Sequence, residues 1–194
     1  MRKPALAAAL PLAAALALPL TAPAPAAAED PLLHLQAFSI NLNNAARTNT
    51  IDIVIERWST PEEIDKLRGI LIEKGGGDSL LSALQKVKPR CGYVRTSNSL
   101  GWDVQFAREV QLDDGTRKIV VATDRPMSFW ETRNAGRSTD YEFTLAEIRL
   151  PKEGKGQGKA ITAAKLSYNR EKNTLEIENY QREPVRLNEI TIVK

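Results

Sequence analysis

The sequence predicts a β-rich α+β domain: an antiparallel curved sheet, either a partly closed barrel or a sandwich, with an inserted helical hairpin. Three observations favour this class. Short segments rich in β-branched residues recur along most of the chain. One stretch, at about 60–88, has apolar residues at helical spacing instead. The connections between the last strand segments are short and polar, as is typical of neighbouring antiparallel strands.

Nine segments are expected to be strands: 33–40, 51–58, 91–96, 102–107, 118–122, 141–150, 160–168, 174–180 and 185–193. In the fourth of them, Trp102, Val104 and Phe106 alternate with other residues, so their side chains should share one face. Asp114-Gly115 then predicts a tight hairpin turn. We expect the last strands to follow one another as a meander.

The helical stretch has clear start and stop signals. Residues 59–63 supply a capping hydroxyl, a proline for the first turn and two acidic side chains near the positive end of a helix. The glycines at 75–77 end this first helix, Asp78 or Ser79 caps a second, and Pro89 ends it. Each helix has an apolar face, so the hairpin should cover one end or one face of the sheet.

The first 28 residues have the pattern of a secretory signal peptide. Two basic residues precede an Ala/Leu-rich stretch, and small residues at 26–28 form a cleavage site. The alternative, a membrane-spanning helix, needs about 20 apolar residues. This run is shorter and carries Pro11 and Pro19, which break helices. We therefore expect an exported protein, periplasmic or extracellular, with a single domain over 29–194. No cysteine lies near the cleavage site, so we expect no lipid anchor and no membrane span.

The mature chain is almost neutral and has a single cysteine. The full sequence has 27 basic and 24 acidic residues, of which the signal contains two basic ones. This balance gives no general affinity for nucleic acid, which we exclude as a partner. Cys91 has no second cysteine to pair with inside the chain, and its position beside a strand predicts a buried side chain. A reactive thiol or an intermolecular bridge is the alternative.

The run Pro151–Ala160, P-K-E-G-K-G-Q-G-K-A, resembles a nucleotide-binding loop only superficially. A P-loop needs glycine where this chain has Glu153 and a hydroxyl where it has Ala160. The glycine spacing also differs from that of dinucleotide-binding loops. We therefore expect a flexible hairpin loop between two strands. The alternative is a contact with an anionic ligand, made by the exposed lysines Lys152, Lys155 and Lys159.

Few residues could support catalysis or a metal. Zinc sites usually draw on several His or Cys ligands, and the mature chain has one of each, His34 and Cys91, far apart in the sequence. A Ser-His-Asp triad would have to use His34. Calcium-loop spacing is absent. We predict no metal, no cofactor and no catalytic residue. For a carboxylate-dependent hydrolase, Asp124 and Glu131 are the best candidates, since they flank an aromatic segment.

The wider stretch between Tyr93 and Tyr141 combines large aromatic and arginine side chains, which together can line a ligand pocket or an interface. The candidate binding residues are Trp102, Phe129, Trp130, Arg95 and Arg125. The alternative is that the aromatic side chains fill the core and the arginines point outward. The polar loop 132–140 is a candidate lid.

Four runs, at 92–96, 98–103, 124–131 and 143–150, resemble those of a family of small secreted bacterial proteins with no assigned function. The resemblance would cover most of the mature chain. It implies export and a shared fold, and it carries no activity, ligand or catalytic residue.

These features favour a secreted, non-enzymatic binding or accessory domain. Its ligand would be a small apolar or anionic molecule, or its partner an envelope protein. One alternative is a structural or assembly partner of the cell envelope, which would expose a sheet edge. The other is a carboxylate-dependent envelope hydrolase.

Overall fold

The computed structural model describes residues 30–40, 48–97, 99–125, 143–172, 174–179 and 183–193. In chain order its elements are β1 (Leu33–Ile40), β2 (Thr48–Ile55), α1 (Pro61–Lys74), α2 (Asp78–Leu84), β3 (Gly92–Thr96), β4 (Trp102–Gln111), β5 (Arg117–Thr123), β6 (Phe143–Leu150), β7 (Gly156–Asn169), β8 (Thr174–Asn179) and β9 (Val185–Ile192). The predicted β-rich α+β class with an inserted helical hairpin is confirmed. The predicted signal peptide lies outside the described residues.

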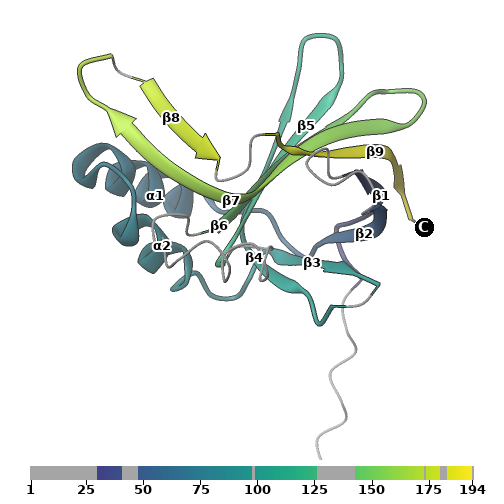
Figure 1. Ribbon diagram of the computed structural model, residues 1–194, viewed down its shortest axis with the longest axis horizontal. Coiled ribbons are helices and arrows are strands. Elements are labelled where there is room, and N and C mark those ends of the chain that lie inside the picture. Colours follow the sequence, from purple (N-terminus) through teal and green to yellow (C-terminus); the bar gives the residue numbers. More distant parts are fainter. Residues whose placement is uncertain are drawn as a thin grey trace, which may run out of the picture.

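The sheet closes into an eight-stranded antiparallel barrel (Figure 1). The strand order is β6-β5-β4-β3-β2-β1-β9-β7, and β7 also pairs with β6 to complete the circle. Of the two predicted arrangements the barrel is therefore correct. The far half of β7 leaves the barrel and pairs with β8, so these two strands form an arm that extends toward the helices (Figure 1).

The barrel interior is filled with aliphatic side chains. Leu35, Ile55, Ile119 and Ile148 have no solvent exposure at all. A barrel of eight strands is just narrow enough for its own side chains to fill it, and each fully buried aliphatic side chain stabilises the fold by roughly 1.5–3 kcal/mol. Cys91 belongs to the same core and is completely buried, as predicted. Because side chains fill the interior, we look for a ligand site on the outer face of the sheet.

Helix α1 begins where the sequence predicts. Thr60 is the N-cap: its hydroxyl accepts from the Glu63 amide at 3.3 Å, and the Glu63 carboxylate accepts from the Thr60 amide at 2.9 Å. Pro61 occupies the first turn, and Gly75 ends the helix in the left-handed conformation. Neither helix, nor any other in the described ranges, is long and apolar enough to cross a membrane.

The helical hairpin is fixed to the outside of the barrel. Leu67, Leu80 and Leu84 form a second apolar cluster with Phe143 and Leu166 of the sheet. Two further contacts join the helices to the arm, because Gly76 forms a β-bridge with Ser167 and the Arg170 guanidinium donates to carbonyls at the end of α1. The hairpin is therefore held in place both by the barrel and by the arm.

Three details differ from the sequence predictions. Strand β9 pairs with β7 and β1 rather than with β8, so the C-terminal strands are not a simple meander. Helix α2 ends at Leu84, before Pro89, and its N-cap is Gly77, which has no side chain to cap with. Barrel closure explains the first difference, since β9 fills the gap between the first strand and the seventh.

A β-bulge in β4 causes the third difference. The pairing register with β5 shifts between Val104 and Phe106. Val104 and Ala107 both point into the barrel and are completely buried, whereas Phe106 packs against the helices outside it. The prediction that Phe106 shares a face with Trp102 and Val104 is therefore wrong, because one extra residue at a bulge reverses the alternation that follows.

Candidate functional site

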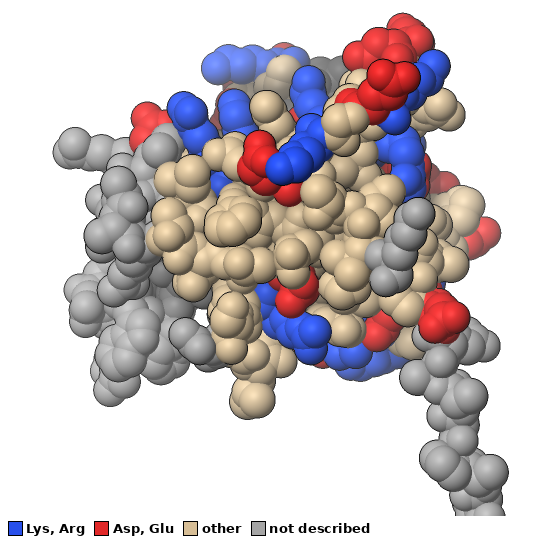
Figure 2. All heavy atoms as spheres, turned by 90° about the vertical axis from the view of Figure 1, so that its right-hand side faces the viewer, with Lys and Arg blue, Asp and Glu red and all other residues tan. Residues whose placement is uncertain are grey.

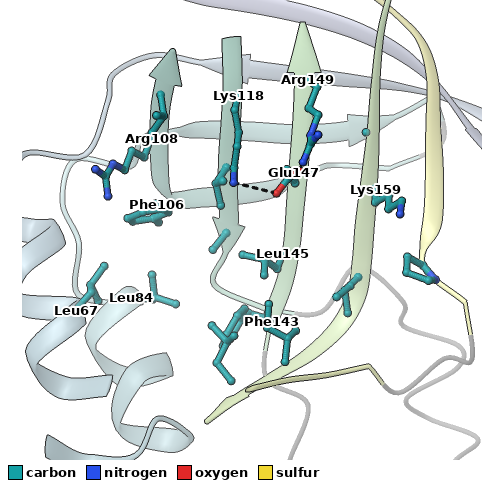
Figure 3. Close-up of a pocket in the computed structure, with 18 of the residues that line it drawn as sticks. Leu67, Leu84, Phe106, Arg108, Lys118, Phe143, Leu145, Glu147, Arg149 and Lys159 are labelled. Atoms are coloured by element: carbon teal, nitrogen blue, oxygen red, sulfur yellow. Dashed lines mark hydrogen bonds and ion pairs between the residues drawn. The ribbon is translucent and has the colours of Figure 1, made fainter. Parts of the chain in front are cut away.

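A large groove lies on the outer face of the barrel, between the helical hairpin and the β7–β8 arm (Figure 3). Its floor is formed by β4, β5, β6 and β7, one wall by α1 and α2, and another by residues of the arm and β9. Its volume is about 1090 Å³, slightly above the roughly 300–1,000 Å³ typical of small-molecule sites.

Strand alternation and register arrange the floor in three rows of side chains. The apolar row, nearest the helices, contains Phe106, Ala122, Leu145 and Ile161. The charged row follows and contains Arg108, Val120, Glu147, Lys159 and Arg186. The distal row contains Val110, Lys118, Arg149 and Gln157. Successive rows are two residues apart on each strand, about 7 Å, so the polarity of the floor changes over a short distance.

The helix side of the groove is apolar. Beyond the apolar row it is lined by Leu67, Leu71, Leu80 and Leu84 of the helices, and by Phe143 and Leu166 of the sheet. Ile177 of β8 lies opposite Leu166 and completes this part. Figure 3 shows Leu67, Leu84, Phe106, Leu145 and Phe143 gathered on this side. An alkyl chain would find aliphatic and aromatic contacts here on three sides.

The opposite side is basic. It contains the cations Arg108, Lys118, Arg149, Lys159 and Arg186, whereas Arg68, the other cation of the lining, belongs to α1 on the helix side. Glu147 is the one acidic member of the lining among the described residues. Lys159 and Arg186 lie directly opposite each other on β7 and β9. In the described part of the chain, neither they nor Arg108 have an ion pair with a carboxylate. This side of the groove therefore has a positive field that the protein itself balances only in part.

Glu147 neutralises part of the distal row. Its carboxylate lies 3.4 Å from the Lys118 ammonium and 2.9 Å from Arg149 Nε, and Figure 3 shows the contact with Lys118. Partial burial raises the pKa of Glu147, but the hydrogen bond from Arg149 and the charge of Lys118 outweigh it, so the pKa lies below its ordinary value. Glu147 is thus an internal counterion for two cations that face each other across the sheet.

The second half of the glycine-rich run belongs to this site as part of a strand, which the sequence prediction of a loop missed. Only residues 151–155 connect two strands; Gly156 is already the first residue of β7. A Cβ atom on Gly158 would lie 2.7 Å from the Glu147 carbonyl oxygen, so glycine permits β7 to approach β6 closely. Lys159 follows on this strand and lies in the groove. The expectation that the whole run is a flexible loop is therefore wrong for its second half.

The candidate binding residues from the sequence lie elsewhere or outside the described residues. Arg95 is on β3, where it pairs with Asp52 at 3.4 Å and lies over the Tyr93 ring. Trp102 begins β4 and is half-buried, and Arg125 donates to the Gly101 carbonyl at 2.8 Å. None of these three lines the groove. Phe129, Trp130 and the candidate lid 132–140 fall outside the described ranges.

Of the two candidates for catalysis, the structure describes Asp124 alone. Burial and the neighbouring Asp103 raise the pKa of Asp124, whereas Glu131 is outside the described residues. Burial likewise raises the pKa of the Cys91 thiol, which makes its thiolate scarcer. In the described ranges, no three residues of the types His, Cys, Asp and Glu come close enough to hold a metal ion. The groove is consequently the feature with the clearest chemistry.

The sequence contained a signal for the groove that the alternation rule could have used. Along β6, Leu145, Glu147 and Arg149 alternate with the buried Ala146 and Ile148. Equivalent alternation in β5 and β7 would place basic residues together, but only a known strand order shows which cations become neighbours.

Searches against protein-family models, curated proteins and solved structures find no significant match to this chain.

Proposed function

We propose that the mature chain is an exported, non-enzymatic binding protein for an anionic amphiphile, a molecule with an apolar chain and a negatively charged head. The observation that carries this proposal is the change from apolar to basic across the groove floor. The apolar row would contact the chain together with the helices, and the charged row would contact the head.

The energetics of the groove support a ligand of this kind. A half-buried side chain such as Leu145 or Ile161 still exposes apolar surface, and covering such surface contributes about 25 cal/mol per Å². Like charges directly opposite each other on neighbouring strands are destabilising, as at Lys159 and Arg186. An anion between them would make an attractive contact with each cation. Relief of the repulsion between the two cations would therefore add to the free energy of binding.

The first experiment is calorimetric titration of the mature protein with decanoate and with decanol at equal concentrations. We expect decanoate to bind and decanol to bind at least tenfold more weakly, because both fill the apolar side and only decanoate satisfies the cations. If neither molecule bound measurably, or if both bound equally, the proposal would be wrong.

Variants locate the site. Leu145→Asn places an amide in the middle of the apolar row and should weaken decanoate binding about tenfold. Its matched control is Ile72→Asn, an exposed apolar residue of α1 that does not line the groove. Arg95→Gln tests the site predicted from the sequence. Loss of binding in Arg95→Gln with none in Leu145→Asn would place the site on β3 instead of in the groove.

A second candidate function, an assembly partner of the cell envelope, rests on another surface. Figure 2 shows the side of the molecule formed by β9, β1 and β2, whose centre is largely free of charged side chains. Phe38 on β1 and Ile192 on β9 are each more than half exposed, and a contiguous apolar patch on this side would favour a protein contact. Phe38→Ser should abolish cross-linking to an envelope protein if this surface is used, and it should leave decanoate binding unchanged.

A further inference from the structure

The excess of positive charge in the groove distinguishes between anionic head groups. Four cations of the groove lining, Arg68, Arg108, Lys159 and Arg186, have no ion pair with a carboxylate in the described structure, while Glu147 already pairs with Lys118 and Arg149. A head with one negative charge would leave most of this excess uncompensated. A head with two charges would balance this excess better.

The geometry of the charged row also matches a head with several oxygen atoms. Because Lys159 and Arg186 are directly paired across strands, their Cβ atoms lie about 5 Å apart, and both side chains can reach one group. A phosphomonoester has about −1.5 to −2 charges at pH 7 and three terminal oxygens. Arginine binds two such oxygens side by side, and lysine supplies a compact charge. A carboxylate has two oxygens and a single charge.

The apolar side limits the tail. Along β6 the floor runs from Glu147 in the charged row through Leu145 to Phe143, and these residues pair with Lys159, Ile161 and Ala164 of β7. The strand from Glu147 to Phe143 is about 14 Å long, which is near the length of an extended decyl to dodecyl chain. The tail region is bounded by the helices on one side and by Leu166 and Ile177 of the arm on the other.

We propose that the preferred ligand is a single-chain alkyl phosphomonoester, with its phosphate between Lys159 and Arg186 and its tail along the apolar row. This inference rests on the proposed function, since it names the class of anionic amphiphile that the same groove selects.

The experiment compares heads on one tail. Decyl phosphate, decyl sulfate, decanoate and decanol are titrated calorimetrically into the mature protein at pH 7.5, below their micelle concentrations, with inorganic phosphate as a fifth titrant. We expect decyl phosphate to bind at least tenfold more tightly than decyl sulfate or decanoate. Equally tight binding of decyl sulfate or decanoate would overturn the head-group inference and leave the proposed function standing. Failure of all three decyl anions to exceed decanol would overturn both.

Inorganic phosphate tests whether the tail matters. We expect it to bind at least a hundredfold more weakly than decyl phosphate, because it makes no contact with the apolar row. If it bound as tightly, the site would be one for free phosphate, and the proposal of an alkyl ligand would be wrong.

A pH series gives an internal control. The second pKa of a phosphomonoester is about 6, so its advantage over decyl sulfate should shrink as the pH falls from 7.5 to 5. The charged groups facing the head come from α1 (Arg68), β4 (Arg108), β5 (Lys118), β6 (Glu147 and Arg149), β7 (Lys159) and β9 (Arg186). The described lining contains no histidine, and the pKa of Glu147 is held below its ordinary value. A preference that stayed constant over this range would contradict the recognition of a second charge.

The variants Lys159→Gln and Arg186→Gln, alone and combined, test the position of the head. Each should lower the preference for decyl phosphate over decanoate, and the double variant should nearly abolish it. Lys172→Gln, in the exposed turn between β7 and β8, is the matched control and should change nothing. A double variant with the full preference, folded by circular dichroism, would show that the head lies elsewhere.

Discussion

Lys159 of β7 and Arg186 of β9 lie directly opposite each other, as a like-charged pair on neighbouring strands of the barrel. In the described structure neither has an ion pair with a carboxylate. Like charges in this arrangement are destabilising, and cross-strand pair effects amount to roughly 0.2–1 kcal/mol. Glu147 lies opposite Lys159 on its other side, so the pair costs stability in the ligand-free protein only as far as this carboxylate does not offset the repulsion. Such a cost is the behaviour expected of residues that serve a ligand.

Arg186→Gln should stabilise the ligand-free protein by about 0.5 kcal/mol, because it removes the repulsion while keeping a long side chain on the strand. The free energy of unfolding in urea at low salt measures this effect, and added salt should reduce it. The same variant should bind decanoate more weakly. If the free energy of unfolding fell in Arg186→Gln and stayed constant in Lys172→Gln, Arg186 would make a favourable contact and would not be destabilised by Lys159.

Removal of the Glu147 charge should have the opposite effects on binding and stability to removal of the Arg186 charge. Glu147→Gln removes the acidic member of the described groove lining and frees Lys118 and Arg149. We expect decanoate to bind about three- to tenfold more tightly, because more positive charge faces the head. The ligand-free variant should be less stable by about 0.5 kcal/mol, since two opposed cations lose their shared partner. Titration calorimetry and urea unfolding measure both effects, and weaker binding by this variant would contradict the assignment of the basic side.

Gly158 permits the close contact between β7 and β6. In Gly158→Ala the new Cβ would lie 2.7 Å from the Glu147 carbonyl oxygen and 3.4 Å from Ile148 Cα, both backbone atoms of β6. The strands must move apart, so we expect a loss of about 1–3 kcal/mol in the free energy of unfolding. Gly69→Ala is the control: it has open space around the new atom in α1 and should stabilise the protein by about 0.5–1 kcal/mol. Equal effects of the two variants would contradict the steric argument.

The sequence was sufficient for the fold class and most elements because local patterns determine them. The turn-forming glycines, the capping residues around Thr60 and the β-branched runs all act over a few residues. The groove depends on relationships that these patterns do not contain. Phe106 reaches the outer face through a bulge, and Arg186 meets Lys159 only because barrel closure places β9 beside β7.

The prediction of a binding site at the aromatic and arginine residues failed to find the groove for a similar reason. It rests on residues that are close together in the sequence, whereas the groove is lined by residues from distant segments of the chain. Arg95, one of those candidates, pairs with Asp52 across the neighbouring strand. The sequence places Lys159 in a loop, with an anion contact as the alternative, because its position in a strand depends on the close approach that Gly158 permits.

The last prediction concerns the N-terminus of α1, whose position fixes one wall of the groove. The Glu63 carboxylate accepts two hydrogen bonds from Arg57, each 2.9 Å long, and also accepts from the Thr60 amide. The Arg57 hydrogen bonds lower the pKa of Glu63 below its ordinary value of 4.5. Glu63→Gln keeps an acceptor for the Thr60 amide, as capping boxes allow, but removes the charge. It should cost about 1 kcal/mol of unfolding free energy at pH 7.

The sign of the pH dependence follows from the lowered pKa of Glu63. A carboxylate with a lower pKa in the folded state contributes stability above its unfolded pKa, and this contribution is lost as the pH falls through the folded pKa. The wild-type protein should therefore exceed Glu63→Gln by the full amount between pH 6 and 8, and the difference should shrink below about pH 4. Urea unfolding at pH 7, 5 and 3 measures it. A difference that stayed constant down to pH 3 would mean that the charge of Glu63 does not stabilise the start of α1, and that its hydrogen bond to Thr60 alone does so.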